Sequence, residues 1–307
     1  MEIIYGFEKL GHQKSSIITL GTFDGLHLGH KKIIDTVITL AQKNNKNSVL
    51  ITFEPHPRII LNKISGDHIF LLSTLKEKLN LLDALGIDKT IVVSFDQGFA
   101  KQDYKEFVSK TLMAKVGMEH LVIGYDHKFG KNREGDSENL KQLALNFNFS
   151  LSSVEPYYID NQPISSTLIR NLLLIGKVEE AARYLGHPYE ISGTVIHGDG
   201  RGKTLSFPTA NLKPLENNKI IPKDGVYAVD VLLLGKKMKA MMNIGSRPTF
   251  KMAGFVPEVH IFDLNENIYD QTVTVYFKKR LRDEMKFSSA EQLIKQLKID
   301  KKQSLKI

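Results

Sequence analysis

The sequence contains no cysteine among its 307 residues, which excludes disulfide bonds and metal sites built on thiolates. It also lacks any apolar run of about 18 residues or more, so no transmembrane helix is predicted. Its first residues, Met1 to Gly6, do not have the layout of a secretory signal peptide, and no internal repeat or low-complexity linker occurs. These absences favour a cytoplasmic protein without a membrane partner.

The charge of the chain is moderately basic. Lysine and arginine number 42 against 34 aspartates and glutamates, a formal net charge of +8. Such an excess can indicate nucleic-acid binding, but the lysines here are scattered among carboxylates. Anionic nucleotide substrates explain the charge equally well, so we expect small-molecule partners and no nucleic acid. The oligomeric state does not follow from the sequence.

The first part of the chain alternates strand-like and helix-like patterns. Short apolar, β-branched runs predict strands at 48–53, 90–95 and 119–125. Helices are predicted from near His27 to Asn44–Asn45, at 74–86 with Thr74 and Glu77 as a capping box, at 103–116, at 166–175 and at 178–184. The alternation predicts an α/β, Rossmann-like domain with a mostly parallel sheet, helices on both faces, and ligands at the carboxyl ends of the strands.

The pattern changes near Gly186. Beyond this point the sequence predicts a hairpin-like turn at Leu234-Gly235-Lys236 and short strands at 190–196, 225–234, 237–244, 256–264 and 271–277. One helix follows at 289–297, capped by Ser288 or Ser289. This part is therefore expected to be a small antiparallel β-barrel with a C-terminal helix. A chain of this length readily forms two domains, and we place them at 1–186 and 187–307.

Residues 21–30, Gly-Thr-Phe-Asp-Gly-Leu-His-Leu-Gly-His, form what we call the Gly-His turn. An apolar run precedes it and a helical pattern follows, so its N–H groups and the helix dipole are expected to favour phosphate. Gly21 and Gly25 lack Cβ and allow a ligand to approach the backbone closely. His27 and His30 share one face of the first helical turn and suit stabilisation of charge in nucleotidyl or phosphoryl transfer. The alternatives are a chance pairing at a helix start, or a zinc site, which the lack of a third ligand at a matching spacing disfavours.

Two downstream segments strengthen the first interpretation. Residues 124–135 resemble the pattern GxDFxFGxxRxG, with His127 where phenylalanine is usual, and residues 164–170 resemble ISSTxIR. Hydroxyls at a helix start can bind phosphate oxygens while capping the helix, and Arg170 lies one turn further on. A solvated loop and an ordinary cap would explain each segment alone. Together with GxFDGxHxGH, they make the first domain similar to the adenylyltransferase half of the prokaryotic bifunctional riboflavin kinase/FAD synthetases.

This resemblance implies that the FMN phosphate attacks the α-phosphorus of ATP and pyrophosphate leaves, with Mg²⁺ neutralising the phosphates. No covalent nucleophile is needed, because positioning and charge stabilisation carry the rate. The residues that the resemblance implies as catalytic in this domain are His27, His30 and Arg170. Those expected to bind ATP are Gly21, Phe23, Asp24, Gly25, Ser165, Ser166 and Thr167. Those expected to bind flavin are His56, Asp126 and Arg133, although the proline-flanked turn around His56 also has a purely structural explanation.

The second domain carries its own signature. A glycine-rich loop at 193–203 leads into Phe207-Pro208-Thr209-Ala210-Asn211-Leu212, which contains the PTAN signature of flavokinases. Thr209 and Asn211 are two apart in an extended segment, so their oxygens face one side and suit Mg²⁺. Without the loop they would be two surface polar residues on an edge strand. The family resemblance makes Glu258 the base that activates the riboflavin 5′-hydroxyl toward the γ-phosphate. It also implies ATP binding at Gly193, Gly198, Gly202 and Lys203, and flavin binding at Arg282 and Phe287.

The kinase loop departs from the family pattern at two positions. Lys203 replaces an arginine and loses its bidentate fork, and Ser206 replaces a glycine. We predict a bifunctional enzyme that makes FMN from riboflavin and FAD from FMN. The alternatives are an adenylyltransferase with a weakened kinase domain, or a non-catalytic flavin- or RNA-binding regulator. The presence of His27, His30 and Glu258 argues against the regulator, because binding alone would not require them.

Overall fold

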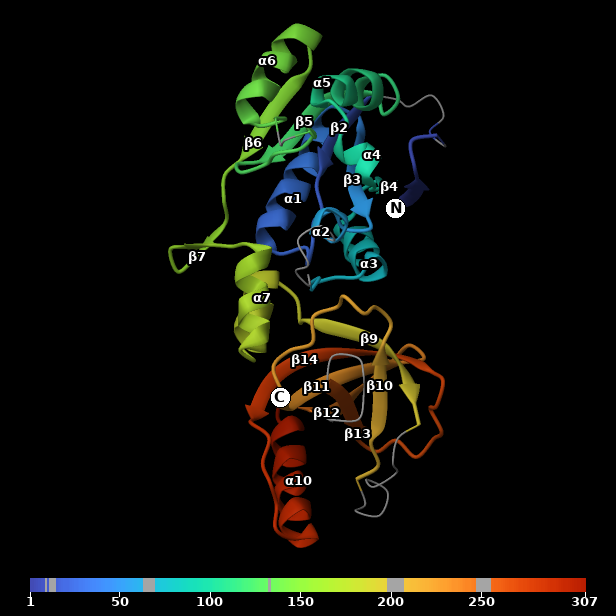
Figure 1. Ribbon diagram of the computed structural model, residues 1–307, viewed down its shortest axis with the longest axis vertical. Coiled ribbons are helices and arrows are strands. Elements are labelled where there is room, and N and C mark those ends of the chain that lie inside the picture. Colours follow the sequence, from blue (N-terminus) through green and yellow to red (C-terminus); the bar gives the residue numbers. More distant parts are fainter. Residues whose placement is uncertain (9, 11–14, 63–69, 132–133, 198–206, 247–254) are drawn as a thin grey trace. The chain divides into compact units, whose positions relative to one another are not determined.

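The computed structural model describes residues 1–8, 10, 15–62, 70–131, 134–197, 207–246 and 255–307, coloured along the chain in Figure 1. It divides into two compact units, Met1–Ser166 and Thr167–Ile307. Helices α7 (Ser166–Leu174) and α8 (Val178–Leu185) join these units in sequence and confirm the two short helices predicted there. Because α8 packs on a strand of the second unit, the unit begins before residue 186. The functional boundary at 186 stays a prediction.

The first unit is built on a six-stranded parallel sheet, as predicted. Its order is β1-β4-β3-β2-β5-β6, and the strands are β1 (Glu2–Tyr5), β2 (Ser16–Leu20), β3 (Asn47–Glu54), β4 (Lys89–Ser94), β5 (Met118–Gly124) and β6 (Ser150–Val154). The two edge strands, β1 and β6, were not predicted. Both are short and poorly buried, since three of the four residues of β1 are exposed and only Val154 of β6 is buried.

Helices cover both faces of this sheet, which confirms the prediction (Figure 1). Neighbouring residues of β2 point to opposite sides: Ile17 packs with Ile34 of α1, and Ile18 packs with Leu112 and Leu140. The helices of this unit are α1 (Leu28–Lys43), α2 (Pro57–Asn62), α3 (Leu75–Leu85), α4 (Gln97–Ala100), α5 (Tyr104–Glu106), the π-helix η1 (Phe107–Met113) and α6 (Ser137–Phe147). A small hairpin, β7 (Tyr158–Ile159) and β8 (Gln162–Pro163), precedes α7.

The predicted helix ends are confirmed where caps define them. Asn44 caps the end of α1, and Thr74 with Glu77 forms the capping box of α3. The helix predicted at 103–116 is present as α5 followed by η1, so its second part, Phe107–Met113, is a π-helix and not an α-helix. The Ser109 hydroxyl donates to the Lys105 carbonyl at 2.8 Å, the acceptor that an α-helical N–H of Ser109 would use.

The second unit is a closed barrel of antiparallel strands in the order β10-β13-β12-β11-β14-β9. The strands are β9 (Glu190–Ile196), β10 (Ala210–Pro214), β11 (Gly225–Leu233), β12 (Lys236–Ser246), β13 (Phe255–Ile261) and β14 (Thr272–Arg282). The predicted barrel and its hairpin turn are confirmed, with Leu234 and Gly235 both at positive φ between the paired residues Leu233 and Lys236. Strand β10, predicted only as an extended segment, closes the barrel.

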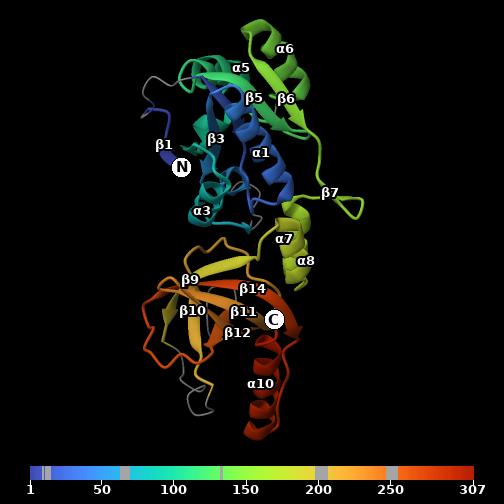
Figure 2. The same cartoon turned by 180° about the vertical axis from the view of Figure 1, so that it is seen from behind.

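Helix α10 (Ala290–Ser304) lies against β11 and β12 and is capped by Ser289, as predicted (Figure 2). Its Ile294 and Leu297 pack against Phe207, Met241 and Phe262, which form one hydrophobic cluster. The helix continues beyond the predicted end at 297. Its last turns are polar, and they are held by Asp300, which is fully buried and accepts two hydrogen bonds from Arg282.

A Gly193→Ala substitution will test whether this glycine serves the barrel rather than ATP. Its Cβ would lie 2.6 Å from Leu212 Cγ and 2.6 Å from the Lys213 carbonyl oxygen, because β9 and β10 approach closely here. Overpacking of this kind costs about 1–3 kcal/mol. We expect faster hydrogen exchange of the β9 and β10 amides. The control is Gly235→Ala, where φ is +78° and no atom lies within 4 Å, so only backbone strain is added. Unchanged exchange in the Gly193→Ala variant would contradict a structural role.

Candidate functional sites

The Gly-His turn is held from inside the first unit by Asp24. The Asp24 carboxylate is 2% exposed and accepts the N–H of Leu72 and that of Ser73, each at 3.0 Å. The Ser73 hydroxyl in turn accepts the N–H of Gly25 at 2.9 Å. The expectation that the N–H groups of the turn face outward is therefore wrong for Gly25, and also for Leu26, which donates to the Phe23 carbonyl. Contacts of these residues with ATP stay a prediction.

The two histidines form a stacked pair at the start of α1. His27 is the N-cap, and its Nδ1 accepts the His30 N–H at 3.3 Å, which leaves Nε2 of a neutral His27 as the protonated, donating nitrogen. The imidazole rings are 3.6 Å apart between centroids and 17° from parallel, which confirms their shared face. The Phe23 ring meets His30 edge-on at 5.2 Å.

Gly21 and Gly29 make room for these rings. A Cβ on Gly29 would lie 3.2 Å from Cε1 and Nδ1 of His27, and one on Gly21 would lie 3.2 Å from the Phe23 ring. The glycine between the two histidines therefore has a steric reason. A side chain at residue 29 would crowd the His27 ring where it folds back over the first turn.

The segment that resembles ISSTxIR contacts the Gly-His turn through Ser166. Its Oγ donates to the Asp24 carbonyl at 3.0 Å across 142 residues of sequence. Ser165 lies next to it, exposed, at the start of α7. Thr167 and Arg170 belong to the second compact unit, so their position facing the turn stays a prediction.

Other expected residues of this site lie at the carboxyl ends of neighbouring strands. The Gly-His turn follows β2, His56 follows β3 and Asp126 follows β5, and β2 is paired with both other strands. These three segments therefore lie at the same edge of the sheet, and their convergence on one ligand site stays a prediction. His56 is buried, and its Nδ1 accepts the Arg58 N–H at 3.1 Å at the start of α2, which favours the structural explanation. Asp126 is exposed, and Arg133 lies outside the described residues.

Lys78 of α3 was missed by the sequence prediction. Its ammonium is buried and donates to Thr52 Oγ1 at 3.1 Å. Burial lowers the pKa of Lys78, while the charges of Asp24 and Glu54 act in the opposite direction. The available signal was its place in the apolar stripe of the helix, three residues after Leu75 and four before Leu82.

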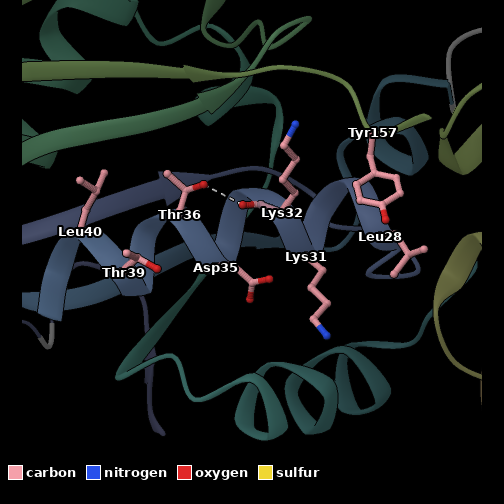
Figure 3. Close-up of a pocket in the computed structure, with 8 residues that line it drawn as sticks. All are labelled: Leu28, Lys31, Lys32, Asp35, Thr36, Thr39, Leu40 and Tyr157. Atoms are coloured by element: carbon pink, nitrogen blue, oxygen red, sulfur yellow. Dashed lines mark hydrogen bonds between the residues drawn. The ribbon is translucent and has the colours of Figure 1, made fainter. Parts of the chain in front are cut away.

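A groove of about 550 Å³ runs along the exposed side of α1 (Figure 3). Its lining comprises Leu28, Lys31, Lys32, Asp35, Thr36, Thr39, Leu40 and Tyr157. Tyr157 lies beside Leu28 at the amino end of the helix, and Lys32 Nζ donates to the Glu155 carbonyl at 3.1 Å. The groove begins one residue after His27, so its lysines add positive charge beside the Gly-His turn.

In the second unit, strand register brings the candidate kinase residues together. Glu258 of β13 is paired with Asn211 of β10 on one side and Asn243 of β12 on the other. Val259, which follows Glu258, and Met242, which precedes Asn243, are buried in the barrel interior. Because side chains alternate along a strand, Glu258 and its paired residue Asn211 belong to the outer face. Thr209 Oγ1 donates to Glu258 Oε2 at 3.3 Å.

The segment that carries Thr209 and Asn211 is fixed by His260. Its Nδ1 donates to the Pro208 carbonyl at 2.7 Å, and burial lowers its pKa, against the effect of that hydrogen bond. Asn211 Oδ1 is buried, and among the described residues it has no hydrogen-bond partner. An amide oxygen and a hydroxyl fit a hard cation such as Mg²⁺. Within the same residues, no cluster of three or more histidines or carboxylates is arranged to hold a metal, so the remaining ligands would have to come from nucleotide and water.

Arg282 and Phe287, expected on the flavin side, are brought together. The guanidinium carbon of Arg282 lies 6.0 Å from the centre of the Phe287 ring, and its Nη2 donates to Asp300 at 2.8 Å. Arg282 of β14 pairs with Val226 of β11, which pairs with Asn243 of β12, and Asn243 in turn pairs with Glu258 of β13. Gly193 is buried on β9 and lies close to Leu212 and Lys213 of β10. Gly198, Gly202, Lys203 and Ser206 lie outside the described residues.

Comparisons with known proteins agree with this division of the chain. The family model for FAD synthetase matches residues 9–168, and the model for riboflavin kinase matches residues 185–307. The Bacillus subtilis (strain 168) protein named bifunctional riboflavin kinase/FMN adenylyltransferase is 36% identical, over 96% of this chain and 93% of its own. The Escherichia coli (strain K12) protein of the same name is 35% identical, over 98% and 96%.

The chain belongs to the bifunctional riboflavin kinase/FMN adenylyltransferase family. A crystal structure from Streptococcus pneumoniae, described as a macrolide-efflux protein, has the same fold, with a TM-score of 0.89 and 34% identity over 98% of both chains. In the described part of this family member, none of the helices is long and apolar enough to cross a bilayer.

A Gly29→Ala substitution will separate the two imidazole rings. The added methyl group would press on His27 from 3.2 Å and move it off His30. Alanine is also the better helix former by about 1 kcal/mol, so the free energy of unfolding should not fall. In NMR spectra, the His30 ring protons should lose the ring-current shift that stacking produces. Thr39→Ala, an exposed change on the same helix, is the control. Unchanged His30 signals in the Gly29→Ala variant would contradict this account of the glycine.

Proposed function

We propose that the chain phosphorylates riboflavin to FMN in its second unit and adenylylates FMN to FAD in its first, using Mg-ATP for both steps. The main support is that each unit assembles a signature from distant parts of the sequence. Ser166 bonds to Asp24 across 142 residues, and Thr209 bonds to Glu258 across 49. An adenylyltransferase with an impaired kinase, or a non-catalytic regulator, is not favoured, because both halves of the relatives' chains are matched.

In the adenylylation step, an FMN phosphate oxygen attacks the α-phosphorus of ATP and the bond to the β-phosphate oxygen breaks. Charge builds on the phosphate oxygens in the transition state. The Nε2–H of His27 and the imidazole of His30 donate toward these oxygens from the amino end of α1, where the helix dipole adds to their effect. Ser165, Ser166, Thr167 and Arg170 position the triphosphate. The proposed roles of Asp126 and Arg133 are in binding FMN.

In the kinase step, Glu258 accepts the proton of the riboflavin 5′-hydroxyl as that oxygen attacks the γ-phosphorus and ADP leaves. Thr209 and Asn211 would hold Mg²⁺, which supplies neutralisation of the phosphate charge when bound. His260 keeps both residues in place through Pro208. Arg282, anchored by Asp300, faces the flavin together with Phe287.

The substrates are anionic or polar small molecules, and the proposal needs neither nucleic acid nor membrane. The cysteine-free composition supports a cytoplasmic enzyme.

The decisive measurement is chromatography of flavins after incubation with Mg-ATP and either riboflavin or FMN. His30→Ala should lower FAD formation about 10²–10³-fold and leave FMN formation intact. Glu258→Ala should lower FMN formation by about 10²–10⁴-fold and leave FAD formation from added FMN intact. Each variant is the other's control. Equal loss of both steps in either variant would overturn the assignment of one reaction to each unit.

The metal role of Asn211 can be tested by magnesium titration of FMN formation. Asn211→Leu removes the buried oxygen, so half-maximal kinase activity should need at least about 10-fold more Mg²⁺. Asn211→Asp keeps an oxygen at this position and should need no more Mg²⁺ than the wild type. The Mg²⁺ dependence of FAD formation should be the same in all three proteins. Equal kinase titrations for the leucine and wild-type proteins would contradict the assignment.

A further inference from the structure

Lys78 is a buried charge behind the Gly-His turn. It lies on α3 with 3% of its surface exposed, so its ammonium is shielded from solvent. Burying an ammonium is costly unless the charge is compensated by opposite charge and hydrogen bonds. The compensating charges are Asp24, within the turn, and Glu54, at the end of β3. The helix therefore carries a charge whose partners belong to the Gly-His turn and the neighbouring strand end.

The hydrogen bonds of Lys78 lead to the same turn. Its Nζ donates to Thr52 Oγ1 at 3.1 Å, and the Thr52 hydroxyl donates to the Thr22 carbonyl at 3.3 Å. The direction is set, because a threonine hydroxyl has one proton and the Thr22 carbonyl can only accept. Thr52 is fully buried on β3, and its hydroxyl links the Lys78 ammonium to the Thr22 carbonyl; we call this pair of hydrogen bonds the Thr52 relay.

The backbone that this relay supports is strained. Thr22 is followed by Phe23 at φ 46°, and Leu26 has φ 42°, both unusual for residues with side chains. Such conformations persist only where the surroundings hold them. One side of the turn is held by the Asp24 carboxylate on Leu72 and Ser73, and the other by Lys78 through Thr52. His27 and His30 follow this backbone directly.

We propose that Lys78 is a positioning residue for FMN adenylylation, which holds the Gly-His turn in register with the substrate phosphates from behind. The inference rests on the proposed function of the first unit. Lys78 acts by neutralising Asp24 and by fixing the Thr22 carbonyl, and it touches neither ATP nor FMN. Loss of this support displaces the imidazoles, and a displacement of about 1 Å is enough to cost about 10²-fold in rate.

The test compares Lys78→Met with Lys76→Met, an exposed lysine two residues earlier on the same helix. Lys78→Met should lower kcat for FAD formation about 10²-fold, and Lys76→Met should not change it. Riboflavin phosphorylation in the same chain should be equal in all proteins and serves as an internal control for protein quality. Thr52→Val removes only the hydroxyl that links Lys78 to Thr22, at nearly constant shape. It should also lower kcat for FAD formation, so the proposal can be tested even if the Lys78→Met protein does not fold.

A double-mutant cycle separates positioning from general destabilisation. If Lys78 acts through the histidines, adding Lys78→Met to His30→Ala should cost less than about threefold more. Full multiplication of the two losses, or wild-type kcat in both Lys78→Met and Thr52→Val, would overturn the proposal. A His30→Ala protein as active as the wild type would instead overturn the proposed site itself. The two failures are therefore distinguishable in one set of assays.

Discussion

The buried carboxylate of Asp24 is the interaction on which the first site depends. It ties the Gly-His turn to residues 72 and 73, while its own carbonyl accepts the hydroxyl of Ser166. A carboxylate so far from water is stable only when hydrogen bonds and positive charge surround it. Both conditions are met by backbone N–H groups and by Lys78. The turn is thus shaped by its inner contacts.

The second site depends on a different constraint, the closure of a barrel. Closure removes free strand edges and sets every residue opposite a defined partner. Glu258 and Asn211 become neighbours because β13 and β10 pair, although the sequence separates them widely. His260 then anchors the segment before Asn211 from the strand that carries Glu258. The two units therefore fix their candidate site residues in different ways, by buried charge in the first and by strand register in the second.

Sequence patterns located most of what is local and little of what is long-range. The capping box at Thr74 and the shared face of His27 and His30 depend on residues close in sequence, and both were predicted. The parallel sheet and the barrel were predicted as fold classes from the order of their local elements, but not the pairing of their strands. Three features were not predicted: the hydrogen bond from the Gly25 N–H to Ser73, the π-helix η1 and the length of α10. Each is accompanied by a side-chain contact that hydrophobic periodicity does not predict: Ser73 with Gly25, Ser109 with the Lys105 carbonyl, and Arg282 with Asp300.

The placement of Glu258 and Asn211 on the outer face of the barrel has a consequence for how the kinase site can change. Side chains alternate between the two faces of a strand, so a shift of β13 or β10 by a single residue would turn these oxygens into the apolar interior. A one-residue change of register would therefore not adjust the position of Glu258 or Asn211 but would remove the shifted residue from the outer face altogether.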